Sequence, residues 1–160
     1  MSRRNNYEGW RTKAPILTLT LLAITLPAFG ALGGDVTTVE ADTAHMQGSL
    51  RITHSGAYAV HEIQTPTGTV IREYASASGK IFAVAWRGPW LPDMQQLLGD
   101  YFQQFADAAQ TQGNQRLGRK PLQITQPGFV LQQFGHMRSF TGRAYIPEML
   151  PPGVSPEAIQ

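Results

Sequence analysis

Four segments between Leu50 and Trp86 alternate apolar and polar residues with a period of two, and short turn sequences separate them. The segments read SLRITHS, AYAVHEIQ, TVIREYAS and KIFAVAWRG, and the turns are Ser55-Gly56, Thr65-Pro66-Thr67-Gly68 and Ser76-Ala77-Ser78-Gly79. β-Branched and aromatic residues at this spacing favour strands, and turns this short join antiparallel neighbours. The sequence therefore predicts an antiparallel meander of about four strands.

Within this meander a pattern repeats after 11 residues, because VHEIQTPTGTVI (60–71) is followed by IREYASASGKIF (71–82). If the first turn has four residues, Ile63 lies opposite Val70, Glu62 opposite Ile71 and His61 opposite Arg72. Glu62 and Glu73 then share one face as diagonal neighbours, about 7 to 8 Å apart at the backbone. A β-bulge at Gly68 or Gly79 would instead shift the facing by one residue and separate the pair.

Helices and further strands flank the meander. Asp35 and Thr37 resemble caps of a short helix that ends at Gly48, in a region spanning residues 31–48. Asp93 caps one long amphipathic helix whose apolar stripe is Met94, Leu97, Leu98, Tyr101, Phe102 and Phe105. LQITQ, GFVLQQFG and HMRSFTGRAYI predict three more strands, which gives a single α+β domain over residues 49–146 with the long helix packed on the sheet. Four prolines make residues 147–160 an extended tail.

The N-terminus has the three-part pattern of a signal peptide. Arg3, Arg4, Arg11 and Lys13 precede an uncharged apolar run, residues 16–26, and small residues follow it. This run is shorter than the roughly 20 residues of a transmembrane helix, although a retained membrane anchor stays an alternative. We expect residues 1–30 to be cleaved after Gly30, which places the mature chain in the periplasm or outside the cell.

Charge and cysteine content narrow the function classes. Four of the 13 basic residues and one of the 11 acidic residues lie before Ala31, so the remaining chain has a formal net charge of −1. A nucleic-acid partner is therefore not expected. With no cysteine, the chain has no disulfide, no thiol chemistry, no cysteine-bound metal and no lipoprotein anchor.

The repeat also supplies the candidate catalytic residues, Glu62 and Glu73. Two carboxylates at such a separation suit hydrolysis of a glycosidic bond. A structural role is favoured, because a hairpin repeated in register places equivalent residues on equivalent faces. His61 and Arg72, which precede the two carboxylates, are candidate ligand-binding residues.

A second group of candidate binding residues follows residue 135. His136, Arg138 and Arg143 stand in GHMRSFTGRAYIP, where paired arginines suit a carboxylate or a phosphate; a solvated edge is the alternative. Trp90, with Trp86, is a candidate carbohydrate platform or a core residue. The histidines at 45, 54, 61 and 136 lack metal-ligand spacing, and no cofactor-binding motif is present, so neither a metal nor a cofactor is expected.

Several motifs in fixed order cover the chain from Ala31 to about Val154: ALGGD, VEAD, YAVHEIQTPTGTVIREYASASGKIFAVAWRGPWLPD, LLGDYF and GHMRSFTGRAYIPEMLPPGV. In these the sequence resembles the secreted proteobacterial family of domain of unknown function 2844. The resemblance implies export and one small domain, and it carries no catalytic residues. We expect a non-catalytic binding or accessory protein of the envelope, with an envelope or secreted protein as partner and no membrane span after cleavage. There are two alternatives. One is a small envelope hydrolase, for example one acting on glycan, that uses Glu62 and Glu73; the other is a structural subunit of an exported assembly that uses an open sheet edge or the tail.

Overall fold

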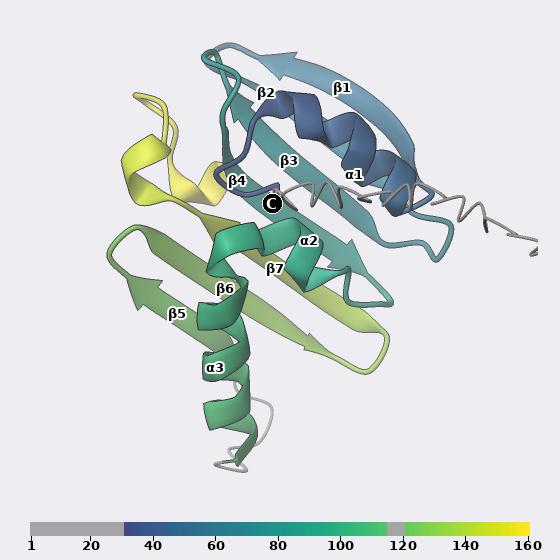
Figure 1. The fold of residues 1–160 in the computed structure, drawn as a ribbon, viewed down its shortest axis with the longest axis vertical. Coiled ribbons are helices and arrows are strands. Elements are labelled where there is room, and N and C mark those ends of the chain that lie inside the picture. Colours follow the sequence, from purple (N-terminus) through teal and green to yellow (C-terminus); the bar gives the residue numbers. More distant parts are fainter. Residues whose placement is uncertain (1–30, 115–120) are drawn as a thin grey trace, which may run out of the picture.

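One seven-stranded antiparallel sheet organises the part of the chain that the computed structural model describes, residues 31–114 and 121–160 (Figure 1). The predicted signal peptide, residues 1–30, lies outside the described residues. The strand order is β1-β2-β3-β4-β7-β6-β5, so the last three strands extend the predicted meander. The α+β class with an antiparallel sheet is thereby confirmed. Its strands are β1 Ser49–Ser55, β2 Tyr58–Gln64, β3 Val70–Ser76, β4 Ile81–Gly88, β5 Leu122–Gln126, β6 Phe129–His136 and β7 Ser139–Tyr145.

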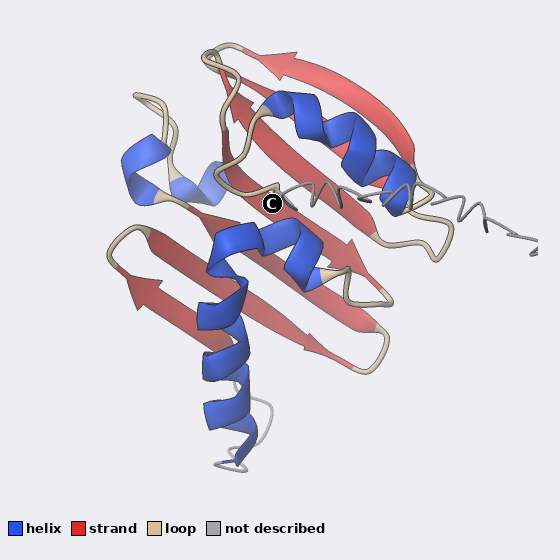
Figure 2. Ribbon diagram, viewed as in Figure 1, coloured by secondary structure: helices blue, strands red, loops and turns tan. Residues whose placement is uncertain are grey.

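All helices longer than one turn in this part of the chain lie on one face of the sheet, in front of it in Figures 1 and 2. They are α1 Val39–His45, preceded by the 3₁₀ turn η1 Val36–Thr38, then α2 Met94–Leu98, η2 Gly99–Tyr101 and α3 Phe102–Asn114. Asp35 caps η1 as expected, with its carboxylate accepting from Thr37 N–H at 3.1 Å.

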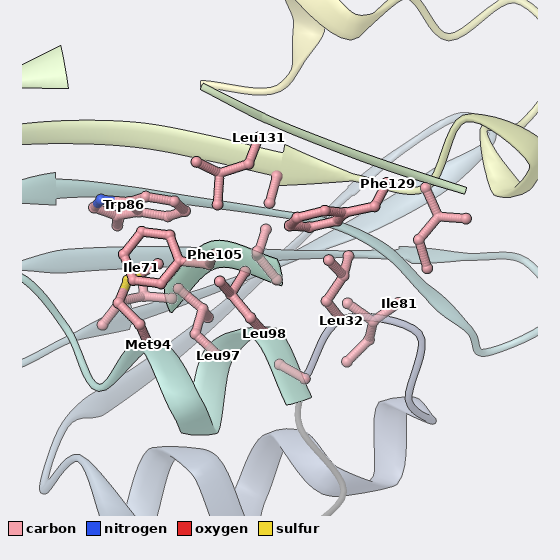
Figure 3. Packing of buried hydrophobic residues seen from close by; sticks show 14 of the residues in the cluster. Leu32, Ile71, Ile81, Trp86, Met94, Leu97, Leu98, Phe105, Phe129 and Leu131 are labelled. Atoms are coloured by element: carbon pink, nitrogen blue, oxygen red, sulfur yellow. The ribbon is translucent and has the colours of Figure 1, made fainter. Parts of the chain in front are cut away.

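The single long helix predicted from Asp93 onward is wrong in detail. Asp93 does cap α2, because its carboxylate accepts from the N–H groups of Gln95 and Gln96. Gly99, however, has φ +52°, a left-handed conformation that ends α2 after five residues. The chain turns there and continues as α3, and Met94, Leu97, Leu98 and Phe105 are all buried on the sheet (Figure 3).

Two turns in the meander share one geometry, which explains the sequence repeat. In the first, Thr65 N–H donates to Thr69 O and Gly68 N–H to Thr65 O; in the second, Ser76 and Gly79 donate in the same way to Lys80 O and Ser76 O. Gly68 and Gly79 have φ of +86° and +79°, which favours glycine. Each turn therefore holds one residue more than a four-residue loop, as in a hairpin with a glycine bulge.

Both faces of the sheet are covered. On the helix face, Ile63, Ile71, Trp86 and Leu131 pack with the helices and with Leu32, which is itself buried (Figure 3). On the other face lies a second cluster of Tyr74, Phe82, Ala83, Ala85 and Ile159. The tail, residues 147–160, is thus not extended: it forms the 3₁₀ turns η3 Pro147–Met149 and η4 Pro156–Ala158 and packs on this face, which we call the tail face.

Gly142 is the point of closest approach in the core. It pairs with Trp86 across β4 and β7, and a Cβ atom at this position would overlap the buried indole ring. We expect Gly142→Ala to lower the free energy of unfolding by about 2 kcal/mol, the usual cost of overpacking a filled core. Urea unfolding measures this. The control repeats Gly142→Ala in a Trp86→Phe background, where a smaller ring replaces the indole that the Cβ would overlap; an equal loss in both backgrounds would show that contact with Trp86 does not set the cost.

Candidate functional site

The extra residue in the first turn separates the two predicted catalytic carboxylates. Gln64 pairs with Val70, so Glu62 lies opposite Arg72 and His61 lies opposite Glu73. Adjacent residues of a strand point to opposite faces, so Glu62 lies on the tail face and Glu73 on the helix face. The predicted register and the shared face of Glu62 and Glu73 are therefore wrong, and the β-bulge alternative is what the structure has.

On the tail face, Glu62 holds two arginines. Its Oε1 accepts from Arg51 Nη2 at 2.6 Å and its Oε2 accepts from Arg72 Nε at 2.8 Å. Partial burial raises the pKa of Glu62, but the hydrogen bonds and charges of Arg72 and Arg51 outweigh burial and hold this pKa below its ordinary value. Glu62 is thus ionised at neutral pH and orients Arg72 rather than acting as an acid.

Arg72 and Arg143 anchor the tail. Arg72 Nη1 donates to Gln160 O at 2.8 Å, and the Tyr74 hydroxyl donates to the same oxygen at 2.8 Å. Arg143 Nε donates to Gln132 Oε1 at 2.9 Å, while its Nη1 donates to Pro156 O at 2.6 Å and to Ile159 O at 3.3 Å. Two of the predicted binding residues are therefore brought together, both beside the last residues of the tail.

Between these arginines lies a pocket of about 380 Å³, which we call the tail pocket. Arg72 and Arg143 lie on neighbouring sides of Ala85 in the sheet, because both pair with it, and Arg87 follows two residues further along β4. The apolar part of the lining includes Phe134 and Ile159. Among the described residues, Arg87 makes no side-chain hydrogen bond or salt bridge, so its donors face the pocket region unpaired. The tail pocket is thus positively charged with an apolar component.

A separate polar cluster is buried under α1 on the helix face. Glu73 is 0% exposed and both its carboxylate oxygens lack a partner within the described structure; His61 Nδ1 and Asp42 Oδ2 also lack one. Gln96 Nε2 donates to the other oxygen of Asp42. Burial raises the pKa of Glu73 to about 8, with the nearby Asp42 charge adding to the effect.

Burial also shifts the pKa values of the other two groups of this cluster, Asp42 and His61. Burial raises the pKa of Asp42 against the opposing hydrogen bond from Gln96, and burial lowers the pKa of His61. Burial thus disfavours the charged form of each of the three groups, and only for Glu73 is the pKa raised as far as about 8. His61 also lines a pocket of about 370 Å³ at the end of the sheet where the β1–β2 and β3–β4 turns lie, but the buried Glu73 does not reach it.

The remaining predicted residues lie elsewhere. Trp90, 55% exposed, follows β4, and its carbonyl accepts from Thr69 Oγ1 at 2.8 Å. Trp86 is buried in the core, so the two tryptophans do not form a shared platform. His136 ends β6, and Arg138 lies in the exposed β6–β7 turn, apart from Arg143.

Sequence reasoning missed Arg87, Gln132, Tyr74 and Asp42. No sequence motif marks Gln132 or Arg87. Once the register is known, their positions in β6 and β4 place both on the same face of the sheet as Arg143. Asp42 looked like an ordinary surface residue of a short helix. Only its position over the sheet makes it a buried charge.

The described residues, 31–114 and 121–160, contain neither a metal-binding cluster nor a membrane-spanning helix. Within them, no three or more His, Asp or Glu side chains gather closely enough to hold a metal ion. No helix in the same ranges has the length and apolar character needed to cross a membrane.

Comparison with known proteins assigns the chain to a family. No curated protein matches the sequence, and no solved structure matches it. Residues 28–159, which include every strand described above, match the family model described as "Protein of unknown function (DUF2844)". The chain belongs to this family.

Proposed function

We propose that this protein is an exported, non-catalytic binding module of the bacterial envelope that takes a small amphiphilic anion into the tail pocket. The observation that carries the proposal is the gathering of Arg72, Arg87 and Arg143 around one pocket that also exposes apolar surface from Phe134, with the buried Ile159 at its wall. Guanidinium groups bind carboxylates and phosphates with paired, charge-assisted hydrogen bonds. A ligand with one anionic head and a short apolar body matches both parts of the lining.

The charge balance of the pocket supports an anion. Glu62 neutralises part of the charge of Arg72 through a salt bridge of 2.8 Å. Arg143 donates to neutral oxygens only, and Arg87 has no carboxylate partner among the described residues. Arg87 therefore has no acidic partner among the described residues, and Arg143 has the exposed Glu157 nearby without a salt bridge. Beside a partly enclosed apolar surface, a bound anion is screened less than at an open surface.

The geometry gives no support to the two-carboxylate hydrolase. Its premise was a shared face, and Glu62 and Glu73 point to opposite sides of the sheet. Glu73 also has no exposed surface through which to reach a substrate. Export to the envelope is part of the proposal and rests on the N-terminal sequence pattern together with the resemblance stated above.

Calorimetric titration with octanoate tests the binding function, with octyl phosphate as a second head group and octanol as the uncharged control. We expect octanoate to bind with a Kd below about 1 mM, worth roughly 4 kcal/mol, and octanol to bind at least about tenfold more weakly because it lacks the charge that Arg87 and Arg143 attract. Arg87→Met is expected to weaken octanoate binding about tenfold, since Arg87 anchors no other part of the fold.

Arg51→Met is the matched control, because Arg51 also lies on the tail face and carries the same charge but does not line the pocket. It is expected to leave octanoate affinity unchanged. Equal affinity for octanol and octanoate, or equal loss in the Arg87 and Arg51 variants, would contradict the proposed site.

A further inference from the structure

Four of the five exposed large hydrophobic side chains in the described residues gather at one end of the sheet. They are Trp90 at 55% exposed, Leu91 at 38%, Phe134 at 46% and Met137 at 89%. Gly88 pairs with Phe140, so the loop after β4 and the β6–β7 turn lie side by side, as Figure 1 shows. We call this region the end surface; Arg87 and Arg138 complete it.

Cationic side chains predominate at the end surface. Arg87 and Arg138 lie in or next to its two loops. The acidic residue nearest in sequence is Asp93, and its carboxylate is held by the N–H groups of Gln95 and Gln96 and by His45. A partner at this end is therefore expected to be anionic.

Arg138 keeps its place at a conformational cost. Its φ is +62°, in the left-handed region that favours glycine. Such a conformation in a residue with a side chain is unfavourable and is typical of positions kept for function. At this turn glycine would adopt the same backbone conformation without strain.

We propose that the end surface docks the protein onto a membrane of anionic phospholipids. Met137 and Trp90 stand on two separate loops, and Met137 is almost fully exposed. A rigid protein partner requires a pocket shaped to each anchoring side chain, whereas a fluid bilayer takes up apolar side chains from separate loops without a matching pocket. Tryptophan and other large apolar side chains favour the interfacial layer, and nearby arginines add attraction to anionic head groups.

Vesicle flotation tests this docking, with vesicles of phosphatidylglycerol and phosphatidylcholine in equal parts and vesicles of phosphatidylcholine alone. We expect the purified protein to float with the mixed vesicles, to bind at least about tenfold less to the neutral ones, and to lose binding at high salt. Trp90→Ser and Met137→Ser are each expected to weaken binding about tenfold. Trp90→Phe keeps an aromatic ring and is expected to bind nearly as well. Subtracting the fluorescence spectrum of Trp90→Phe from that of the wild type gives the emission of Trp90, which is expected to shift to shorter wavelength on docking.

Arg138→Gly separates docking from stability. This variant removes a charge and relieves the left-handed strain, so it should bind the mixed vesicles more weakly while its Tm rises. All variants retain the same N-terminal segment, and none of the three positions lines the tail pocket, so octanoate binding stays unchanged in them.

Two results would overturn the proposal. Undiminished flotation of the Trp90→Ser and Met137→Ser variants would show that another segment binds the lipid. Absence of wild-type binding to mixed vesicles would exclude a lipid partner, and capture of an acidic protein through Trp90 in that case would assign the end surface to a protein instead.

Discussion

Replacing Glu73 by Gln is expected to stabilise the protein at alkaline pH and to leave its stability almost unchanged near pH 4. The carboxylate is fully buried with no hydrogen-bond partner in the described structure, and burial raises its pKa to about 8. Glutamine keeps the shape of the neutral acid and never ionises. The wild-type protein, in contrast, must hold an unpaired buried charge or unfold once Glu73 loses its proton.

The direction of this effect follows from proton binding. The ordinary pKa of a glutamate in an unfolded chain is 4.5, against a pKa of about 8 for Glu73 in the folded chain. Between these two values the folded state binds more protons than the unfolded state, so wild-type stability falls as pH rises from 4.5 to about 8. At about 1.4 kcal/mol per pKa unit, the variant gains on the order of 5 kcal/mol above pH 8. Burial also raises the pKa of Asp42. Ionisation of Asp42 therefore lowers the stability of the wild type and of the variant alike as pH rises.

Urea unfolding at a series of pH values measures this difference. Glu62→Gln is the matched control, since the folded-state pKa of Glu62 is lowered by Arg72 and Arg51. That variant should lose stability above pH 4.5, where the wild-type carboxylate is ionised, and should match the wild type at lower pH. Parallel pH profiles for the wild type and Glu73→Gln would contradict a neutral, buried Glu73.

Replacing Arg143 by Met is expected to release the tail and to lower the free energy of unfolding by about 3 kcal/mol. The guanidinium donates to Gln132 Oε1, Pro156 O and Ile159 O, and hydrogen bonds from charged donors contribute about 1.5 to 3 kcal/mol each in favourable cases. Methionine retains the apolar stem but leaves these three oxygens unpaired. Ile159, now 1% exposed, would then separate from Tyr74 and Phe82.

Hydrogen exchange is the sharper measurement for this variant. Faster exchange at the N–H of Gln160, which donates to the Tyr74 hydroxyl at 3.0 Å, would report release of the tail, and octanoate binding would fall with it. Arg138→Met has the same change of charge at an exposed turn and should shift neither quantity. Unchanged exchange at Gln160 in Arg143→Met would show that Arg72 and Tyr74 hold the tail without it.

The strands were predictable because their signals are local. β-Branched alternation and glycine-bearing turns located β1 to β7 to within a few residues, although they gave no reason why β7 pairs with β4. The register was not predictable. The turn sequence of residues 65–68 is compatible with a four-residue turn and with a longer one. One extra residue in the turn decides which face of the sheet Glu62 and Glu73 occupy.

Some residues of the candidate site could be predicted from the sequence, but their proximity in space could not. Arg72 and Arg143 are 71 residues apart in the sequence, and they meet only because both flank β4. The prolines of the tail predict an extended segment, because they exclude regular helices and strands. Burial of Met149, Leu150 and Ile159 against the second cluster outweighs that preference, and no local pattern reports a contact of this range.

The pairing of β4 with β7 also joins two halves of the sheet that are expected to form separately during folding. Strands β1 to β4 are joined by short turns, as are β5 to β7, so each half forms from neighbouring segments. Residues 83–88 meet residues 140–145 only across a long stretch of chain, and closing such a loop is slow compared with forming a hairpin. We therefore expect this seam to limit the folding rate. A chain emerging in order from its N-terminus would hold the surface of Phe82 and Tyr74 uncovered until its final residues arrive, and in that interval it would depend most on a chaperone.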